Sequence, residues 1–281
     1  MLNRASKPFV KLVEKYLPDP YIFVLLLTLI TLVFAVVIQD QSPLTTVQQW
    51  GDGFWGLLTF SMQMLLVLVT GFMLACTPLV KTLLENLARL AKGPGSAIVL
   101  VTLVSLTASW INWGFGLVVG ALFAKALARK VSVDYRLLVA SAYSGFIVWH
   151  GGLAGSVPLT IATPGHFSEA QIGVIGTSET IFSGFNLLLL AIMFVVIPLV
   201  NRLMLPPKSE SVIVDSTKLQ DDVLPSSANE RPADRLENSK ALGLLVGFTG
   251  LAYLTNYFIS GGGLNLNIVN TLFLFLAIVL H

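Results

Sequence analysis

The stretch that decides the fold is "SWINWGFGLVVG", residues 109–120, which lies in the middle of a long apolar region. It places Asn112 before Trp113 and sets glycines at 114 and 116, where a membrane helix is usually most regular. An amide side chain and glycine both favour the end of a helix over its interior. The stretch therefore predicts a helix break deep inside an apolar segment.

The rest of the chain has the composition of an integral membrane protein. Of its 281 residues, 55% are hydrophobic and 11% are charged, whereas a soluble domain carries about 25% charged residues. The apolar runs are long and do not alternate as barrel strands do, so we expect an all-α polytopic membrane protein. The net charge of +2 and the lack of a basic tract do not indicate nucleic acid as a partner. The single Cys76 excludes an intramolecular disulfide.

The basic residues predict the topology. All 17 Lys and Arg residues lie in the four segments 1–20, 77–96, 125–136 and 201–240. The segments 39–53, 150–180 and 259–267 contain none. Basic residues collect on the cytoplasmic side of a membrane, so the N-terminus is expected inside the cell. Residues 1–20 are predicted to form an amphipathic helix on the cytoplasmic surface, followed by a span over 21–38 and a returning span over 54–76.

Residues 97–128 are predicted to form a re-entrant hairpin, because both ends lie beside basic segments. The apolar arms 97–110 and 114–128 would each be roughly 21 Å long as helices. A bilayer core is about 30 Å thick, so arms of this length would turn near mid-membrane. The alternative is one long helix, which would place "KALARKV" outside and break the charge pattern.

The next segment, 137–163, is predicted to be a broken helix, because Gly151, Gly152, Gly155 and Pro158 interrupt it. Two adjacent interrupted segments are the sequence pattern that indicates a transporter binding site. The remaining expected elements are a span over 181–200, a polar cytoplasmic linker over 201–240, and further spans over 241–281.

Five stretches of the sequence carry a family resemblance: "LPDPYIFVLLLTLIT", "WGDGFWGLLTFSMQM", "INWGFGLVVGALFA", "ATPG" and "SGFNLLL". They resemble the AtoE-type short-chain fatty acid transporters of the ion-transporter superfamily. The resemblance implies an inverted-repeat secondary transporter for small monocarboxylates, such as butyrate or acetoacetate, in the bacterial cytoplasmic (inner) membrane. Residues 21–200 would be the first repeat and 241–281 the start of the second. His150 departs from the family pattern, which often has a small residue there.

By this resemblance the chain looks truncated. We expect it to insert into the membrane but to present only half of a ligand shell, and therefore not to transport unless a homodimer restores the missing half.

The tip carries no charged side chain, so a carboxylate substrate would be bound by neutral donors. The expected substrate-binding residues are Asn112, Ser109, Gly114, Gly116, Ser156, Thr160 and Thr163. Asn112 is singled out because a mid-membrane amide needs a partner and the sequence offers it no evident structural one. No organic cofactor is expected. The coupling ion is Na⁺, with a candidate position near Asn112 and Ser156, or H⁺, for which His150 is the candidate carrier.

Two other classes stay open at this stage. A channel, or a carrier for another small organic anion, could use the same hairpin. An intramembrane enzyme is disfavoured, because the sequence offers no convincing pair of nucleophile and base.

Overall fold

The structure is a computed structural model that describes residues 2–215, 219 and 239–280. Within these residues every regular element is helical and none is a strand. Six helical segments in this part are long and apolar enough to cross a membrane. The expectation of an all-α polytopic membrane protein is confirmed. Most of the predicted linker, residues 216–218 and 220–238, lies outside the described residues, as does His281.

The chain divides into two compact units, Met1–Met62 and Gln63–His281. The first unit contains α1 (Leu2–Tyr16), α2 (Pro20–Val37) and α3 (Pro43–Gly53) and the start of α4. Helix α3 lies in the segment 39–53, for which the sequence analysis predicts no helix. Ser42 nevertheless caps it, with its hydroxyl accepting the Thr45 N–H at 3.1 Å, and Pro43 occupies its first turn. A capping serine and a proline in the first turn are ordinary signals of a helix start, but the distribution of Lys and Arg does not show them.

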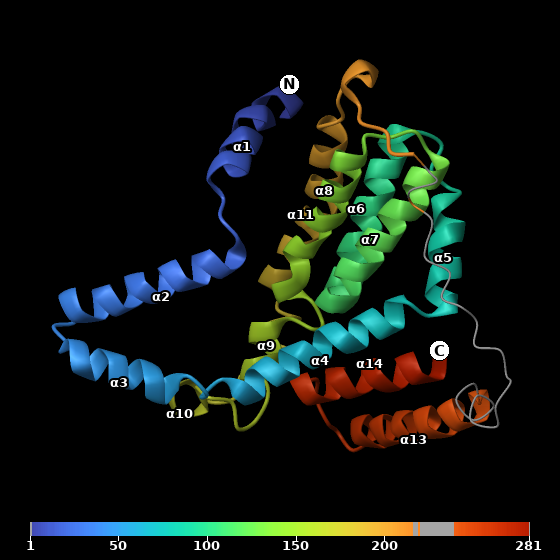
Figure 1. Cartoon of the computed structure of the whole chain (residues 1–281). Coiled ribbons are helices and arrows are strands. Elements are labelled where there is room, and N and C mark those ends of the chain that lie inside the picture. The colour runs from blue at the N-terminus through green and yellow to red at the C-terminus, as the bar shows by residue number, and fades with distance from the viewer. Residues whose placement is uncertain (1, 216–218, 220–238, 281) are drawn as a thin grey trace, which may run out of the picture. The chain divides into compact units, whose positions relative to one another are not determined.

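The second unit holds the remaining helices (Figure 1). They are α4 (Leu58–Ala75, from residue 63 on), α5 (Pro78–Ala88), α6 (Pro94–Ile111), α7 (Trp113–Lys130), α8 (Tyr135–Ser144), η1 (Gly145–Gly151), α9 (Ser156–Ile161), α10 (Glu169–Ile172), α11 (Gly184–Leu203), η2 (Lys208–Glu210), α13 (Lys240–Ile259) and α14 (Leu266–Leu280). Helices α6, α7, α8 and α11 run alongside one another (Figure 1).

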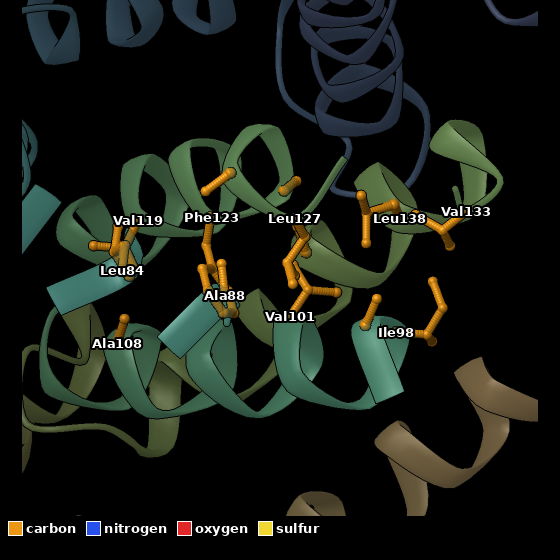
Figure 2. Packing of buried hydrophobic residues seen from close by; sticks show 14 of the residues in the cluster. Leu84, Ala88, Ile98, Val101, Ala108, Val119, Phe123, Leu127, Val133 and Leu138 are labelled. Carbon is orange, nitrogen blue, oxygen red and sulfur yellow. The ribbon is translucent and has the colours of Figure 1, made fainter. Parts of the chain in front are cut away.

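The main hydrophobic core lies between α5, α6, α7 and α8 (Figure 2). Phe123 and Leu127 of α7 are fully buried, and Figure 2 shows Phe123 directed toward Ala88 of α5 and Leu127 toward Val101 of α6. Helix α5 was not predicted, since 77–96 had been assigned as a basic loop. It buries Val80, Leu84 and Ala88, which are spaced four residues apart and so form one apolar stripe. The basic residues of this segment therefore lie on an amphipathic helix and its flanks.

Helices α6 and α7 form an antiparallel hairpin with Asn112 as the only residue between them. Small residues face each other across it: a Cβ placed on Gly120 would lie 3.0 Å from the Ser105 hydroxyl. Each arm has 18 residues, about 27 Å of helix, which is longer than the predicted arms. Arm length therefore no longer distinguishes a re-entrant hairpin from two spans, and that distinction depends on the basic residues alone.

In the segment 137–163, where a broken helix is predicted, the regular α-helix ends earlier than the glycines at 151 and 152 indicate. Helix α8 changes into the 3₁₀ segment η1 at Gly145, and the chain becomes extended at Gly152 before α9 starts. The Ser105 hydroxyl donates a hydrogen bond to the Ala142 carbonyl, and a Cβ on Gly145 would lie 2.6 Å from the Leu106 nitrogen. Close packing against α6 therefore accompanies the change of helix type, and this contact is not visible in the sequence.

The connection between α7 and α8 is held by the buried carboxylate of Asp134. It accepts hydrogen bonds from the Leu137 N–H (2.9 Å), the Arg136 guanidinium (2.8 Å) and the Val212 N–H (2.8 Å). Burial raises the pKa of the Asp134 carboxyl, but the hydrogen bonds from Arg136, Val212 and Leu137 together bring it below its ordinary value of 3.8. The ionised carboxylate therefore fastens the segment after α11 to the cytoplasmic end predicted for the hairpin.

The close contact between Gly116 of α7 and Ser109 of α6 gives a prediction for protein stability. A Cβ on Gly116 would lie 2.5 Å from both the backbone nitrogen and the Cα of Ser109, so Gly116→Ala must push the two arms apart. We expect a loss of about 1–3 kcal/mol of stability, as for other overpacked sites. Gly184→Ala, at the start of α11, is the control because no atom lies within 4 Å of the added carbon. Thermal unfolding in detergent measures both, and equal midpoints would contradict the close contact of the arms.

Candidate functional site

The tip of the hairpin is a single extended residue, Asn112 (φ −155°, ψ 127°). Its backbone N–H donates to the Ala108 carbonyl at 2.9 Å and so completes α6. Its side-chain Oδ1 accepts the Phe115 N–H at 2.9 Å and so caps α7. Asn is a preferred N-cap because its short side chain reaches the free N–H groups of the first turn. The expectation that Asn112 lacks a structural partner is therefore wrong for one half of its amide.

Helix α4 covers the tip at very short range. A Cβ on Gly114 would lie 2.7 Å from the Leu68 Cα, and a Cβ on Gly71 would lie 2.9 Å from the Asn112 Oδ1. Neither position has room for a side chain. Gly114 and Gly116, both predicted site residues, therefore serve close backbone approach, Gly114 toward α4 and Gly116 toward Ser109 on the opposite arm.

The break after η1 meets the hairpin tip directly. The Leu153 N–H donates to the Trp110 carbonyl at 2.7 Å, which satisfies a carbonyl in the last turn of α6. A Cβ on Gly152 would lie 3.0 Å from the Trp110 Cα, so a glycine fits where the two backbones touch. The two interrupted segments that the sequence singled out therefore lie together in the structure.

Several buried polar groups on the residues of the hairpin tip and on α9 have no hydrogen-bond partner in the part of the chain that the structure describes. They are the Asn112 Nδ2, the Ser109 and Ser156 hydroxyls, and the indole nitrogens of Trp110 and Trp113. An unpaired buried polar group costs about 1–3 kcal/mol. Such groups are therefore expected to bind a partner during function. Asn112 itself has no exposed surface, so the described conformation is closed over its free N–H groups.

The other predicted hydroxyls are already engaged. Thr160 donates to the Ser156 carbonyl at 2.6 Å, and Thr163 donates to the Leu159 carbonyl at 2.6 Å. Thr163 also accepts the Leu266 N–H of α14 at 3.2 Å. These two threonines can accept further hydrogen bonds, but their protons are committed. No hydrogen bond of the described structure joins Asn112 to Ser156, which lies three residues beyond the contact made by Leu153.

A Na⁺ position near Asn112 and Ser156 stays a prediction. The Asn112 Oδ1 accepts the Phe115 N–H and keeps one lone pair, whereas the unpaired end of the amide is the Nδ2 donor. Turning the amide over would set its NH₂ group against the Phe115 N–H, with two donors facing each other. The free group at the tip therefore suits an anion. Among the described residues, no group of three or more His, Cys, Asp or Glu side chains could hold a metal.

Sequence reasoning missed two asparagines in α11 that tie the site to its surroundings. Asn201 Nδ2 donates to the hydroxyls of Thr102 on α6 (3.0 Å) and Ser144 on α8 (2.7 Å). Asn186 Nδ2 donates to the Gly151 carbonyl at 3.0 Å, next to the break. An amide inside or at the rim of an apolar span was a visible signal, because such a group must find a partner in lipid.

Comparison with known proteins gives one family and two relatives. A family model described as "Short chain fatty acid transporter" matches residues 1–281. A protein of Escherichia coli (strain K12) named "Putative short-chain fatty acid transporter" is 45% identical over 288 residues, covering 100% of this chain and 65% of the relative. A protein of Haemophilus influenzae with the same name is 41% identical over 293 residues, covering 100% of this chain and 66% of the relative. This chain thus spans just under two thirds of the length of each relative. No solved structure matches it.

The two halves of the Asn112 amide give opposite predictions for stability. Asn112→Ala removes the cap oxygen and is expected to cost about 1 kcal/mol. Asn112→Ser keeps a cap oxygen and removes the unpaired buried NH₂ group, so it should be no less stable than the wild type. Thermal unfolding in detergent measures the difference. If the Ser variant were as unstable as the Ala variant, the NH₂ group would have a structural partner.

Proposed function

The chain belongs to the short-chain fatty acid transporter family, and from this premise we propose that it carries short-chain fatty acids such as butyrate or acetoacetate across the membrane as a secondary transporter. The observation that carries the proposal is the set of unpaired buried donors where the hairpin tip meets the helix break. The family is one of transporters and not of enzymes.

We place the carboxylate of the substrate at the start of α7. The Asn112 Nδ2 and the Ser109 hydroxyl would donate to it, with the Ser156 hydroxyl contributing from α9. The positive end of the α7 dipole also favours an anion there. We leave Thr160 and Thr163 out of the carboxylate shell because both hydroxyl protons are already committed to carbonyls. Neutral donors suit a carrier, because they bind an anion less strongly than a charged side chain would in a medium of low dielectric constant, and the anion can therefore be released.

Access to this position requires movement. Asn112 and Ser109 are buried, and Gly71 and Gly114 leave no space between α4 and the tip. A carboxylate therefore reaches the Nδ2 group only when the tip separates from α4 or from the break. Pairing the free donors with a carboxylate would recover the cost of leaving them unpaired, so substrate would favour the conformation that admits it.

The topology is proposed from charge. With residues 1–20 and the ends of the 97–128 hairpin on the cytoplasmic side, all 17 basic residues lie in cytoplasmic segments. The same scheme puts the linker over 201–240 inside. The grouping of residues 21–200 as the first repeat is implied by the family resemblance. It applies to the cytoplasmic (inner) membrane of a bacterium, with the hairpin entering and leaving on the inner side.

Binding is the primary test, because it requires the site alone. Purified protein in nanodiscs is expected to bind labelled butyrate saturably and to release it when unlabelled acetoacetate is added. Asn112→Ser should weaken binding about tenfold or more without loss of stability, while Thr82→Ala, on the exposed face of α5, is the control. Wild-type affinity in the Ser variant would remove Asn112 from the site.

The coupling ion and the transport class are tested in reconstituted vesicles. Na⁺ and proton gradients are imposed separately. Saturable butyrate uptake under one of them would identify the coupling ion, and by the sequence analysis such uptake requires a homodimer. Uptake that rises linearly with concentration and ignores both gradients would indicate a channel. Native mass spectrometry of the same preparation tests the homodimer that the sequence left open.

Cysteine labelling tests the topology in a Cys76→Ala background. An impermeant thiol reagent added outside intact cells should label Gly263→Cys, where no atom lies within 4 Å of the added carbon, and Gln49→Cys. It should not label Lys130→Cys at the end of α7 until the cells are permeabilised. Strong external labelling of Lys130→Cys would refute the re-entrant hairpin.

A further inference from the structure

A row of aromatic rings begins at the hairpin tip and continues along the broken helix. Trp113, the first residue of α7, meets Trp149 with ring centroids 5.8 Å apart and Phe146 with centroids 6.3 Å apart, both edge-on. Phe146 stacks on Trp149 at 4.8 Å, and Tyr143 stacks on Phe146 at 6.0 Å. The rings come from two elements, α7 and the α8–η1 segment, so the row joins the two interrupted segments on one side.

The row is accessible where the Asn112 donors are not. Trp113, Phe146 and Trp149 are half-buried, and Tyr143 is exposed. Tyr143 also lines a pocket between α7 and α8, together with Leu117 and Ala142 among others. The surface of this pocket is mostly apolar carbon. Trp113, Phe146 and Trp149 do not line this pocket, but their rings are themselves partly exposed, so a small apolar group can lie along them.

The Trp113 side chain is the link between the rings and the polar tip. It directly follows Asn112 in the chain, and its indole N–H is buried without a partner among the described residues. Indole nitrogen can only donate. The residue thus combines an apolar wall with a free donor and directly follows the residue whose amide is proposed to bind the carboxylate, a combination that suits a short amphiphilic anion.

We propose that Trp113, Phe146 and Trp149 bind the acyl chain of the substrate and set its permitted length, with Trp113 as the specificity-determining residue. This inference rests on the proposed function. Aromatic rings have few rotatable bonds, and these three are braced against one another, so they form a wall of fixed length. Each methylene placed against the wall should strengthen binding about fourfold, and a chain that extends past it should gain nothing.

The test is a chain-length profile of binding to the purified protein in nanodiscs, from acetate to hexanoate. For the wild type we expect affinity to rise about fourfold per methylene, so about 16-fold from acetate to butyrate, and then to level off or fall. Trp113→Ala and, independently, Phe146→Leu should flatten this rise, lowering the butyrate-to-acetate ratio severalfold. Trp113→Phe keeps a ring and loses the donor, so it should weaken all chain lengths together and keep the rise.

The control is Trp50→Ala, which removes an exposed aromatic from a ring pair on α3 and should leave the whole profile unchanged. Melting temperatures show which variants are folded. If folded Trp113→Ala and Phe146→Leu proteins keep the wild-type ratio, or lose affinity equally at every length, the aromatic row does not select chain length and the inference is overturned. If the wild type binds none of these acids, the proposed function fails instead, and the two failures are distinguishable.

Discussion

The structure of the second unit depends on one constraint: a helix must end and another must begin within a single residue, in surroundings that offer no water. Asn112 meets this constraint with three groups, because its N–H closes α6, its carbonyl accepts the Gly116 N–H at 2.8 Å, and its Oδ1 caps α7. In lipid or protein interior each of these backbone groups would cost several kcal/mol if unpaired. The glycines at 71, 114 and 116 follow from the same turn, since they let neighbouring backbones close over it and exclude solvent. In this closed arrangement the Asn112 Nδ2 is buried without a hydrogen-bond partner among the described residues.

The sequence predicted the larger features of this arrangement. Hydropathy, charge and the interruptions at Gly114, Gly116 and Gly151 were enough for the membrane class, the hairpin and the broken helix, because these features follow from local residue types. The sequence did not predict where the break starts, because Gly145 is set by its contact with Ser105, which is 40 positions away in the chain. It also assigned Asn112 wholly to function, although one end of the amide is a helix cap that the pattern of Asn before a helix already permitted.

The missed helices have a common cause. Helices α3 and α5 lie in segments for which the sequence analysis used only the distribution of charged residues. Each helix nevertheless begins with proline in its first turn, and α5 carries an apolar stripe. Asn186 and Asn201 were missed for different reasons. The span over 181–200 is predicted from its apolar residues, which gives Asn186 no role, and Asn201 falls in the predicted linker, whereas α11 continues to Leu203. Which helix each amide would reach is a tertiary fact: Asn201 joins α6 and α8 through Thr102 and Ser144, and only the packing decides that.

The bond between the Trp110 carbonyl and the Leu153 N–H has a consequence for biogenesis. The carbonyl is made roughly 40 residues before its partner, and a ribosome adds about 5–20 residues per second. For several seconds the hairpin must therefore exist with an unpaired acceptor at its tip, a state that the hydrocarbon core penalises. The hairpin is better held at the water-filled mouth of the insertion machinery, or at the membrane surface, until the segment around Leu153 has been synthesised. Insertion of the two interrupted segments as one late, concerted event would then be a requirement of synthesis and not only a property of the finished protein.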